Sequence, residues 1–142
     1  MMTKYYDAYK PVFDRVQTDL EALSATIKKV VLGEQFRVTE LPMAIISPDP
    51  TDIGQAVFGT TLDNKVNMSV VLLIRETEPT NWFTDIVSVM GDIVDAILAD
   101  RTLNGKATDI IPTFFAPGEV RTSGKLYYGG VVRFRATMFF TP

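Results

Sequence analysis

The chain has 142 residues, of which 46% are hydrophobic and 22% charged, a balance typical of a folded globular protein. It contains neither cysteine nor histidine. These two absences exclude disulfides, thiolate metal sites and a cysteine nucleophile, and they remove the usual general base near neutral pH. With 14 basic and 17 acidic residues the net charge is −3, so the strongly basic composition of many nucleic-acid-binding proteins is missing.

Length and hydropathy indicate a single domain. We predict one domain over residues 1–142, because this length suits one core and is short for two. No run approaches the roughly 18 apolar residues of a membrane span. The segment Met1–Asp7 has no apolar signal core, so we expect the protein to be made in the cytoplasm and to stay there.

The first predicted element is an amphipathic helix over residues 9–31. Its apolar positions recur at spacings of three and four: Val12, Phe13, Val16, Leu20, Leu23, Ile27, Val30 and Val31. Pro11 suits the first turn of such a helix, and Gly33 suits the position just past its end. Acidic residues come early on the polar face and Lys28 and Lys29 come late, as the helix dipole favours.

Short strands are predicted next at Phe36–Leu41 and Met43–Ile46, separated by Pro42, which marks an edge or a bend. Residues 47–54 follow as a loop with two prolines. Two aspartates in this loop are far short of the six to eight oxygens that Ca²⁺ takes, so we predict no metal site there.

A long hairpin is predicted over residues 56–76. It would consist of a strand at 56–62, a turn at Asp63-Asn64 and a long strand at 65–76. The long strand alternates with a period of two through Val66, Met68, Val70, Leu72 and Ile74. A strand of this length would span roughly 40 Å, so we expect part of the hairpin to project as an arm.

The second predicted helix covers residues 81–99. Its apolar stripe contains Trp82, Phe83, Ile86, Val87, Met90, Ile93, Val94, Ile97 and Leu98, and its polar face contains Asp85, Ser88, Asp92 and Asp95. The stripe should lie on the sheet. Asp92 and Asp95 are one turn apart and could be read as a general acid/base pair, but a solvated face is the better interpretation.

The last predicted elements are strands over residues 107–141. A polar turn at Asp100–Gly105 precedes them. Ile110–Phe115 is predicted as an interrupted strand, followed by a looser section from Pro117 to Gly124. The final strand spans Lys125–Thr141, with a bend or bulge at Gly129-Gly130.

The final strand has two different faces. One carries Val132, Phe134, Ala136, Met138 and Phe140, and the other carries Val131, Arg133, Arg135, Thr137 and Phe139. A mixture of apolar and arginine side chains is typical of a subunit contact. The candidate subunit-interface residues are Val131, Arg133, Arg135 and Phe139, with Lys65 and Asn67 from the long hairpin strand. No catalytic residue, cofactor-binding residue, cofactor or metal site is predicted.

The order of elements is an N-terminal helix, a strand pair through Leu41–Ile46, a hairpin into Val70–Ile74, a helix from Trp82 to Ala99, and the turn Ala99–Gly105 before a closing strand pair. In this order the chain resembles the tail terminator, or tail-to-head joining, proteins of tailed bacteriophages. The resemblance implies an α+β fold: an antiparallel or mixed β-sheet with a long hairpin, packed against one central amphipathic helix and an N-terminal helix. It carries over no functional residue.

The resemblance also implies a function. Such a protein is a virion component at the head–tail junction, a hexameric ring without catalytic activity that terminates the tail tube and provides the docking face for the neck. Its partners would be other copies of itself, the tail tube protein, a neck or head-completion protein, and DNA passing through the lumen without sequence-specific binding. No membrane is involved, and assembly would occur in the host cytoplasm.

Two other functions stay open. A head-completion or neck connector protein would have the same kind of structural role at a different height in the virion. A small-molecule-binding or regulatory α+β domain would also fit a helix packed on a sheet, and a compact monomer with a filled ligand cavity would favour it.

Overall fold

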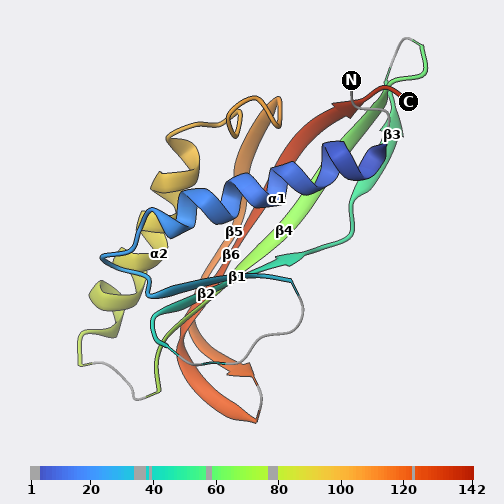
Figure 1. Cartoon of the computed structure of the whole chain (residues 1–142). Coiled ribbons are helices and arrows are strands. Elements are labelled where there is room, and N and C mark those ends of the chain that lie inside the picture. The colour runs from blue at the N-terminus through green and yellow to red at the C-terminus, as the bar shows by residue number, and fades with distance from the viewer. Residues whose placement is uncertain (1–3, 34–37, 39, 57–58, 77–79, 123) are drawn as a thin grey trace.

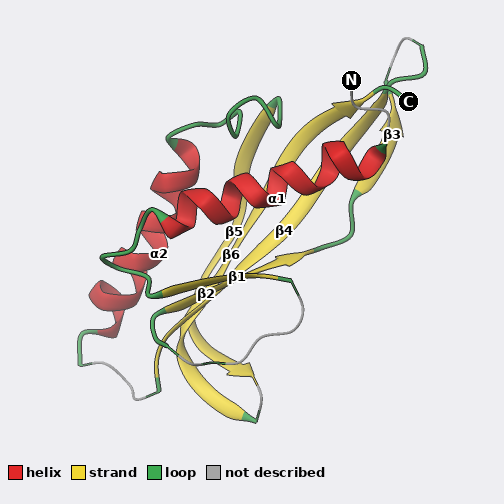
Figure 2. Ribbon diagram, in the orientation of Figure 1, coloured by secondary structure: helices red, strands yellow, loops and turns green. Residues whose placement is uncertain are grey.

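The computed structural model describes residues 4–33, 38, 40–56, 59–76, 80–122 and 124–142. Over these residues, two helices lie on one face of a six-stranded mixed sheet, so the predicted α+β class is confirmed (Figures 1 and 2). The elements are α1 (Tyr5–Glu21), β1 (Lys29–Leu32), β2 (Met43–Pro48), β3 (Asp52–Gln55), β4 (Leu62–Arg75), α2 (Trp82–Leu98), β5 (Asp109–Thr122) and β6 (Lys125–Phe140).

The sheet is built around β4 and β6. The strand order is β1-β2-β4-β6-β5, and β3 pairs separately with the start of β4. β1 runs parallel to β2, and all the other pairs are antiparallel. β4 and β6 pair from Leu62 opposite Phe140 to Arg75 opposite Tyr128. This long central ladder places the side chains of both strands in a fixed register.

The main core lies between the helices and the sheet. Alternate residues of β4 and β6 face the helices and are buried: Val66, Met68, Val70, Leu72, Val132, Phe134, Ala136, Met138 and Phe140. The helices contribute Val12, Phe13, Val16, Leu20, Ile86, Met90, Ile93 and Ile97. Full burial of each large aliphatic side chain contributes about 1.5–3 kcal/mol. The predicted period-two alternation and both apolar stripes are therefore confirmed over these residues.

A smaller cluster covers part of the opposite face. Met43, Ile45, Leu73 and Tyr127 are buried there, packed against half-buried residues that include Val38 and Leu41 of the β1–β2 connection. These two residues thus cover part of one end of that face. The other end, along β3, the first half of β4, the start of β5 and the second half of β6, has no helix over it (Figure 2).

The N-terminal helix differs from its prediction at both ends. It begins at Tyr5, because Tyr5 and Tyr9 pack on Phe140 and Phe13 and extend the buried stripe by a turn. Pro11 is therefore inside the helix and not in its first turn. The helix ends at Glu21, and the predicted last turns instead form a bend and β1, whose β-branched valines suit the pleated ladder with β2.

The predicted hairpin exists with different bounds. β3 is Asp52–Gln55, almost wholly within the predicted loop, and the predicted strand at 56–62 is wrong, because its described residues before Leu62 form no strand. Asp63 and Asn64 belong to β4 and not to a turn. Asn64 is fully buried and bonded to the core, which explains why it is not at the turn. β4 is paired on both sides and packed in the core, so it is not a free arm, although the end of the hairpin extends past the N-terminal end of α1 (Figure 1).

Other boundaries are closer to prediction. Met43–Pro48, Trp82–Leu98 and Lys125–Phe140 match the predicted elements within a few residues. The predicted looser section from Pro117 to Gly124 is wrong as far as Thr122, because β5 continues through it as an edge strand, where proline is tolerated. The predicted strand at Phe36–Leu41 falls largely outside the described residues, as does the side chain of Trp82. Phe83 is exposed, since the buried stripe of α2 begins one turn later at Ile86.

Candidate functional site

The helix-free end of the sheet carries an exposed mixture of basic and apolar side chains. We call this surface the open face and define it by Lys65, Asn67, Ile111, Phe114, Val131, Arg133, Arg135, Thr137 and Phe139. In the β4–β6 ladder Lys65 lies opposite Thr137, and Asn67 lies opposite Arg135. All six sequence-predicted interface residues lie on this one face. Each has an odd residue number in β4 or β6, and the odd-numbered residues of these paired strands share a face.

Sequence reasoning missed two members of the open face, both in β5. Ile111 pairs with Arg135, and Phe114 pairs with Arg133. A bulge between Pro112 and Phe114 shifts the alternation, so that residues three apart share a face. A strict period of two assigns them to opposite faces. The exposed fractions of Ile111, Phe114 and Phe139 are 42%, 43% and 50%.

Both arginines of the open face are held in place without a carboxylate. The guanidinium carbon of Arg133 lies 4.5 Å from the ring centre of Phe114, a cation–π arrangement. Nε of Arg135 donates to Oδ1 of Asn67 at 3.0 Å. In the part of the chain that the structure describes, neither guanidinium has an ion-pair partner. Two fixed positive charges are thus available to a partner.

The lysine of the open face, unlike the two arginines, has a carboxylate partner within the chain. Nζ of Lys65 lies 3.3 Å from Oδ1 of Asp63 and donates to Oγ1 of Thr137, also at 3.3 Å. Its charge is therefore partly offset within the chain. The positive potential of the open face comes mainly from Arg133 and Arg135.

Two hollows mark the open face. One, of about 370 Å³, lies between the β2–β3 loop and both arginines, and its lining includes Asp49, Pro50 and Phe114. The loop is fixed, because Oγ of Ser69 donates to Asp49 at 2.6 Å and Nδ2 of Asn67 donates to the carbonyl of Pro50 at 3.0 Å. The other, of about 250 Å³, is lined by Lys65, Asp109, Ile111, Arg135 and Thr137. These hollows could receive side chains of a partner.

A second charged surface lies on α2. Its solvent side carries Asp85, Ser88, Asp92 and Asp95 at helical spacings of three and four, which we call the acidic stripe. Residues 82–98 contain no lysine or arginine. None of the three aspartates forms an ion pair with another described residue. On this side of α2, Asp85 and Asp95 are exposed and Asp92 is half-buried.

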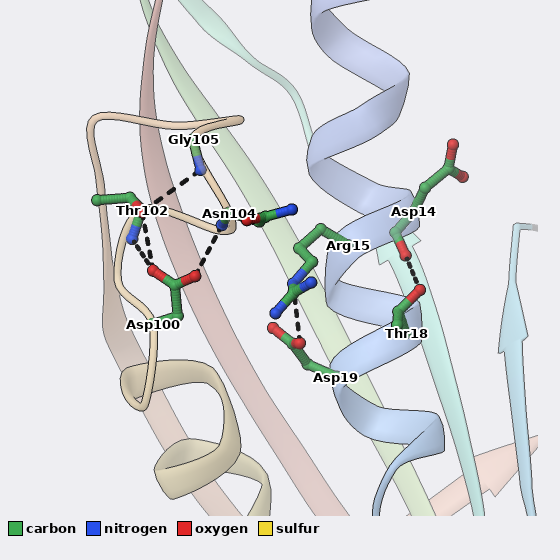
Figure 3. A network of polar contacts seen from close by, with 8 residues as sticks. All are labelled: Asp14, Arg15, Thr18, Asp19, Asp100, Thr102, Asn104 and Gly105. Atoms are coloured by element: carbon green, nitrogen blue, oxygen red, sulfur yellow. Dashed lines mark hydrogen bonds and ion pairs between the residues drawn. The ribbon is translucent and has the colours of Figure 1, made fainter.

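Two groups of polar contacts lie near each other, one on α1 and one in the turn after α2 (Figure 3). Oδ1 of Asp100 accepts from the amide and hydroxyl of Thr102 at 3.1 and 2.8 Å, and its Oδ2 accepts from the amide of Asn104 at 2.9 Å. The bond from the Thr102 hydroxyl is the main reason that the pKa of Asp100 is lowered. The turn holds Leu103 fully buried with φ 51°, so its hydrogen bonds have a structural role.

The pair beside that turn is partly buried. Nε of Arg15 lies 3.0 Å from Oδ1 of Asp19, one helical turn away on α1. Burial raises the pKa of Asp19, and the nearby Arg15 opposes that rise. The pair lies near Asp100, whose charge raises the pKa of Asp19 further (Figure 3).

Within the described ranges, no group of three or more acidic side chains is placed to hold a metal ion. No helix in those ranges is long and apolar enough to cross a membrane. No protein-family model matches the chain, and no curated protein matches it.

Proposed function

We propose that this protein is a structural virion protein at the head–tail junction of a tailed bacteriophage. Copies of the chain form a ring, hexameric as the family resemblance implies, which terminates the tail tube and offers a docking face to the neck. The tail tube protein and a neck protein are its partners, and DNA passes through the lumen.

The observation that carries this proposal is the open face. Exposed aromatic and aliphatic side chains share this face with two arginines that lack carboxylate partners within the described residues. Arginine and aromatic residues are enriched at protein interfaces, and clusters of exposed apolar side chains mark interaction sites. The face lies on the central strands, so it is a rigid surface for contact with another protein.

The charge of the chain agrees with a ring around DNA. A net charge of −3 gives little attraction to phosphates, so DNA can slide without being retained. The order of elements, which resembles that of tail terminators, supports the same function.

The test is disruption of the gene in the phage genome that encodes this chain. Loss of a terminator should give tails of uncontrolled length that are not joined to heads, visible by electron microscopy of lysates. Tails of normal length that lack heads would instead favour the neck connector. Tails of normal length joined to heads would contradict both structural functions.

A further inference from the structure

The open face and the acidic stripe are complementary in charge and lie on opposite sides of the molecule. Arg133 and Arg135 are on the helix-free face of the sheet. The acidic stripe is on α2, which packs on the other face through Ile86, Met90 and Ile93. Because the sheet separates them, the stripe of one chain cannot reach the arginines of the same chain.

We infer that the acidic stripe of one copy docks on the open face of the next copy, with carboxylates of Asp92 and Asp95 at the guanidinium groups of Arg133 and Arg135. This inference rests on the proposed ring and identifies its subunit contact. Each copy gives one surface and receives the other, which makes the contact heterologous. A heterologous contact builds a closed ring when its rotation closes.

The spacings of the two charge sets are similar. Arg133 and Arg135 are two residues apart on one strand, a separation of roughly 7 Å. Asp92 and Asp95 are three residues apart on a helix, a rise of about 4.5 Å, and Asp85 extends the stripe to about 15 Å. Long arginine side chains span the difference, and an arginine–carboxylate pair can form two parallel hydrogen bonds.

The apolar side chains around the arginines suit this contact. Ile111 and Phe114 pair with Arg135 and Arg133, and Phe139 lies four residues farther along β6 on the same face. A docked helix would remove them from water and shield the charge pairs, and shielded pairs at the centre of an interface contribute more than pairs at its rim. Side chains of the incoming helix would fill the hollow of about 370 Å³ beside the arginines.

The edge of the sheet is a poorer contact than its face. β5 is an edge strand with exposed apolar residues, and such a strand could pair with a second copy. However, it contains Pro112 and Pro117 and is interrupted by a bulge. Proline has no N–H to donate to a ladder, and both features discourage pairing between edges.

The test is charge reversal on each surface. We would prepare Arg133→Glu/Arg135→Glu, Asp92→Lys/Asp95→Lys, and a variant with all four changes, and measure mass by light scattering across concentration. Each double variant should weaken self-association at least about a hundredfold, because like charges then face each other. A mixture of the two double variants, and the fourfold variant alone, should regain most of the association.

Two comparisons make the result decisive. Lys28→Glu/Arg121→Glu changes the net charge as much as Arg133→Glu/Arg135→Glu does, but away from the open face. This control variant should associate like the unmodified chain. Thermal melting of every variant checks folding.

If the unmodified chain assembles and the fourfold variant does not, the inferred contact between the acidic stripe and the open face is wrong, while the proposed ring is not contradicted. Association of both double variants at full strength would also overturn it. A chain that neither associates nor, when its gene is disrupted, alters tails would overturn the proposed function itself.

Discussion

Gly129 shows how a single residue fixes the central ladder. A Cβ atom at this position would collide with the backbone carbonyl of Leu72. The irregularity predicted near Gly129 lies opposite it, since the β4–β6 register shifts between Leu73 and Arg75. Glycine is required here because the adjacent strand approaches too closely for any side chain.

Gly129→Ala should therefore lower the free energy of unfolding by at least about 2 kcal/mol, since the backbone atoms it meets cannot move aside. Gly91→Ala is the control. Gly91 is inside α2 with nothing near a new Cβ, so alanine should raise stability by about 0.5–1 kcal/mol. Urea denaturation measures both, and equal effects of the two changes would contradict this account.

The turn at Asp100 should make the stability of the folded protein depend on pH in the acidic range. The pKa of Asp100 is lowered in the folded protein, chiefly by the bond from Thr102. Its carboxylate thus stabilises the fold above its unfolded pKa, and this contribution is lost as the pH falls through the folded pKa. Asp100→Ala should lower the melting temperature at pH 7, and its difference from the unmodified chain should shrink below about pH 4.

Thr102→Ala separates the two parts of that prediction. It removes the hydroxyl donor and keeps the carboxylate, so its acid dependence should be intermediate between those of Asp100→Ala and the unmodified chain. An Asp100→Ala deficit that stays constant from pH 7 to pH 2 would contradict the assigned role.

At the scale of elements, a partly buried hydrogen bond connects α1 to the sheet. The Tyr5 hydroxyl donates to Oδ1 of Asn64 at 2.8 Å, and Nδ2 of Asn64 donates to the carbonyl of Met138 at 3.1 Å. Asn64 is fully buried in β4. One amide therefore connects α1, β4 and β6.

Tyr5→Phe should cost about 1–2 kcal/mol, because it leaves a buried acceptor of Asn64 without its donor. Tyr6→Phe provides the matched control, since the Tyr6 side chain is 63% exposed and should tolerate the change. Thermal and urea denaturation of both variants would check this. Equal stability of the two would show that the Tyr5–Asn64 bond contributes nothing.

The elements with strong periodicity could be predicted from the sequence. α2, β4 and β6 each bury one regular set of apolar residues, and that pattern is local. β1 could not be predicted, because Val30 and Val31 also continue the helical spacing of α1, and only pairing with β2 decides between the two. β3 is exposed throughout and has no apolar alternation to detect.

The candidate site was predictable to the same degree. Arg133, Arg135 and Phe139 alternate with core residues in one strand, so their shared face follows from the period of two. The face on which Phe114 lies was not predictable, because it depends on a bulge between Pro112 and Phe114 that no local sequence pattern indicates. The complementarity between the open face and the acidic stripe needs the layer order, which only the three-dimensional structure supplies.

At the scale of the whole molecule, the open face should contribute to assembly and little to folding. Phe114→Ser/Phe139→Ser should weaken self-association at least about tenfold, because it removes apolar area at the contact. Phe115→Ser is the control. Phe115 is as exposed as Phe114, but it pairs with Val132 and therefore lies on the other face of the sheet. Sedimentation of each variant over a range of concentrations measures the effect, and equal weakening by both changes would count against the open face.

The most direct test of the ring is electron microscopy of the purified protein at high concentration, with its mass in solution measured on the same sample. The proposed function predicts hexameric rings with a central hole wide enough for duplex DNA, and a mass that falls towards the monomer on dilution. Particles that stay compact and monomeric at every concentration would contradict a ring built through the open face.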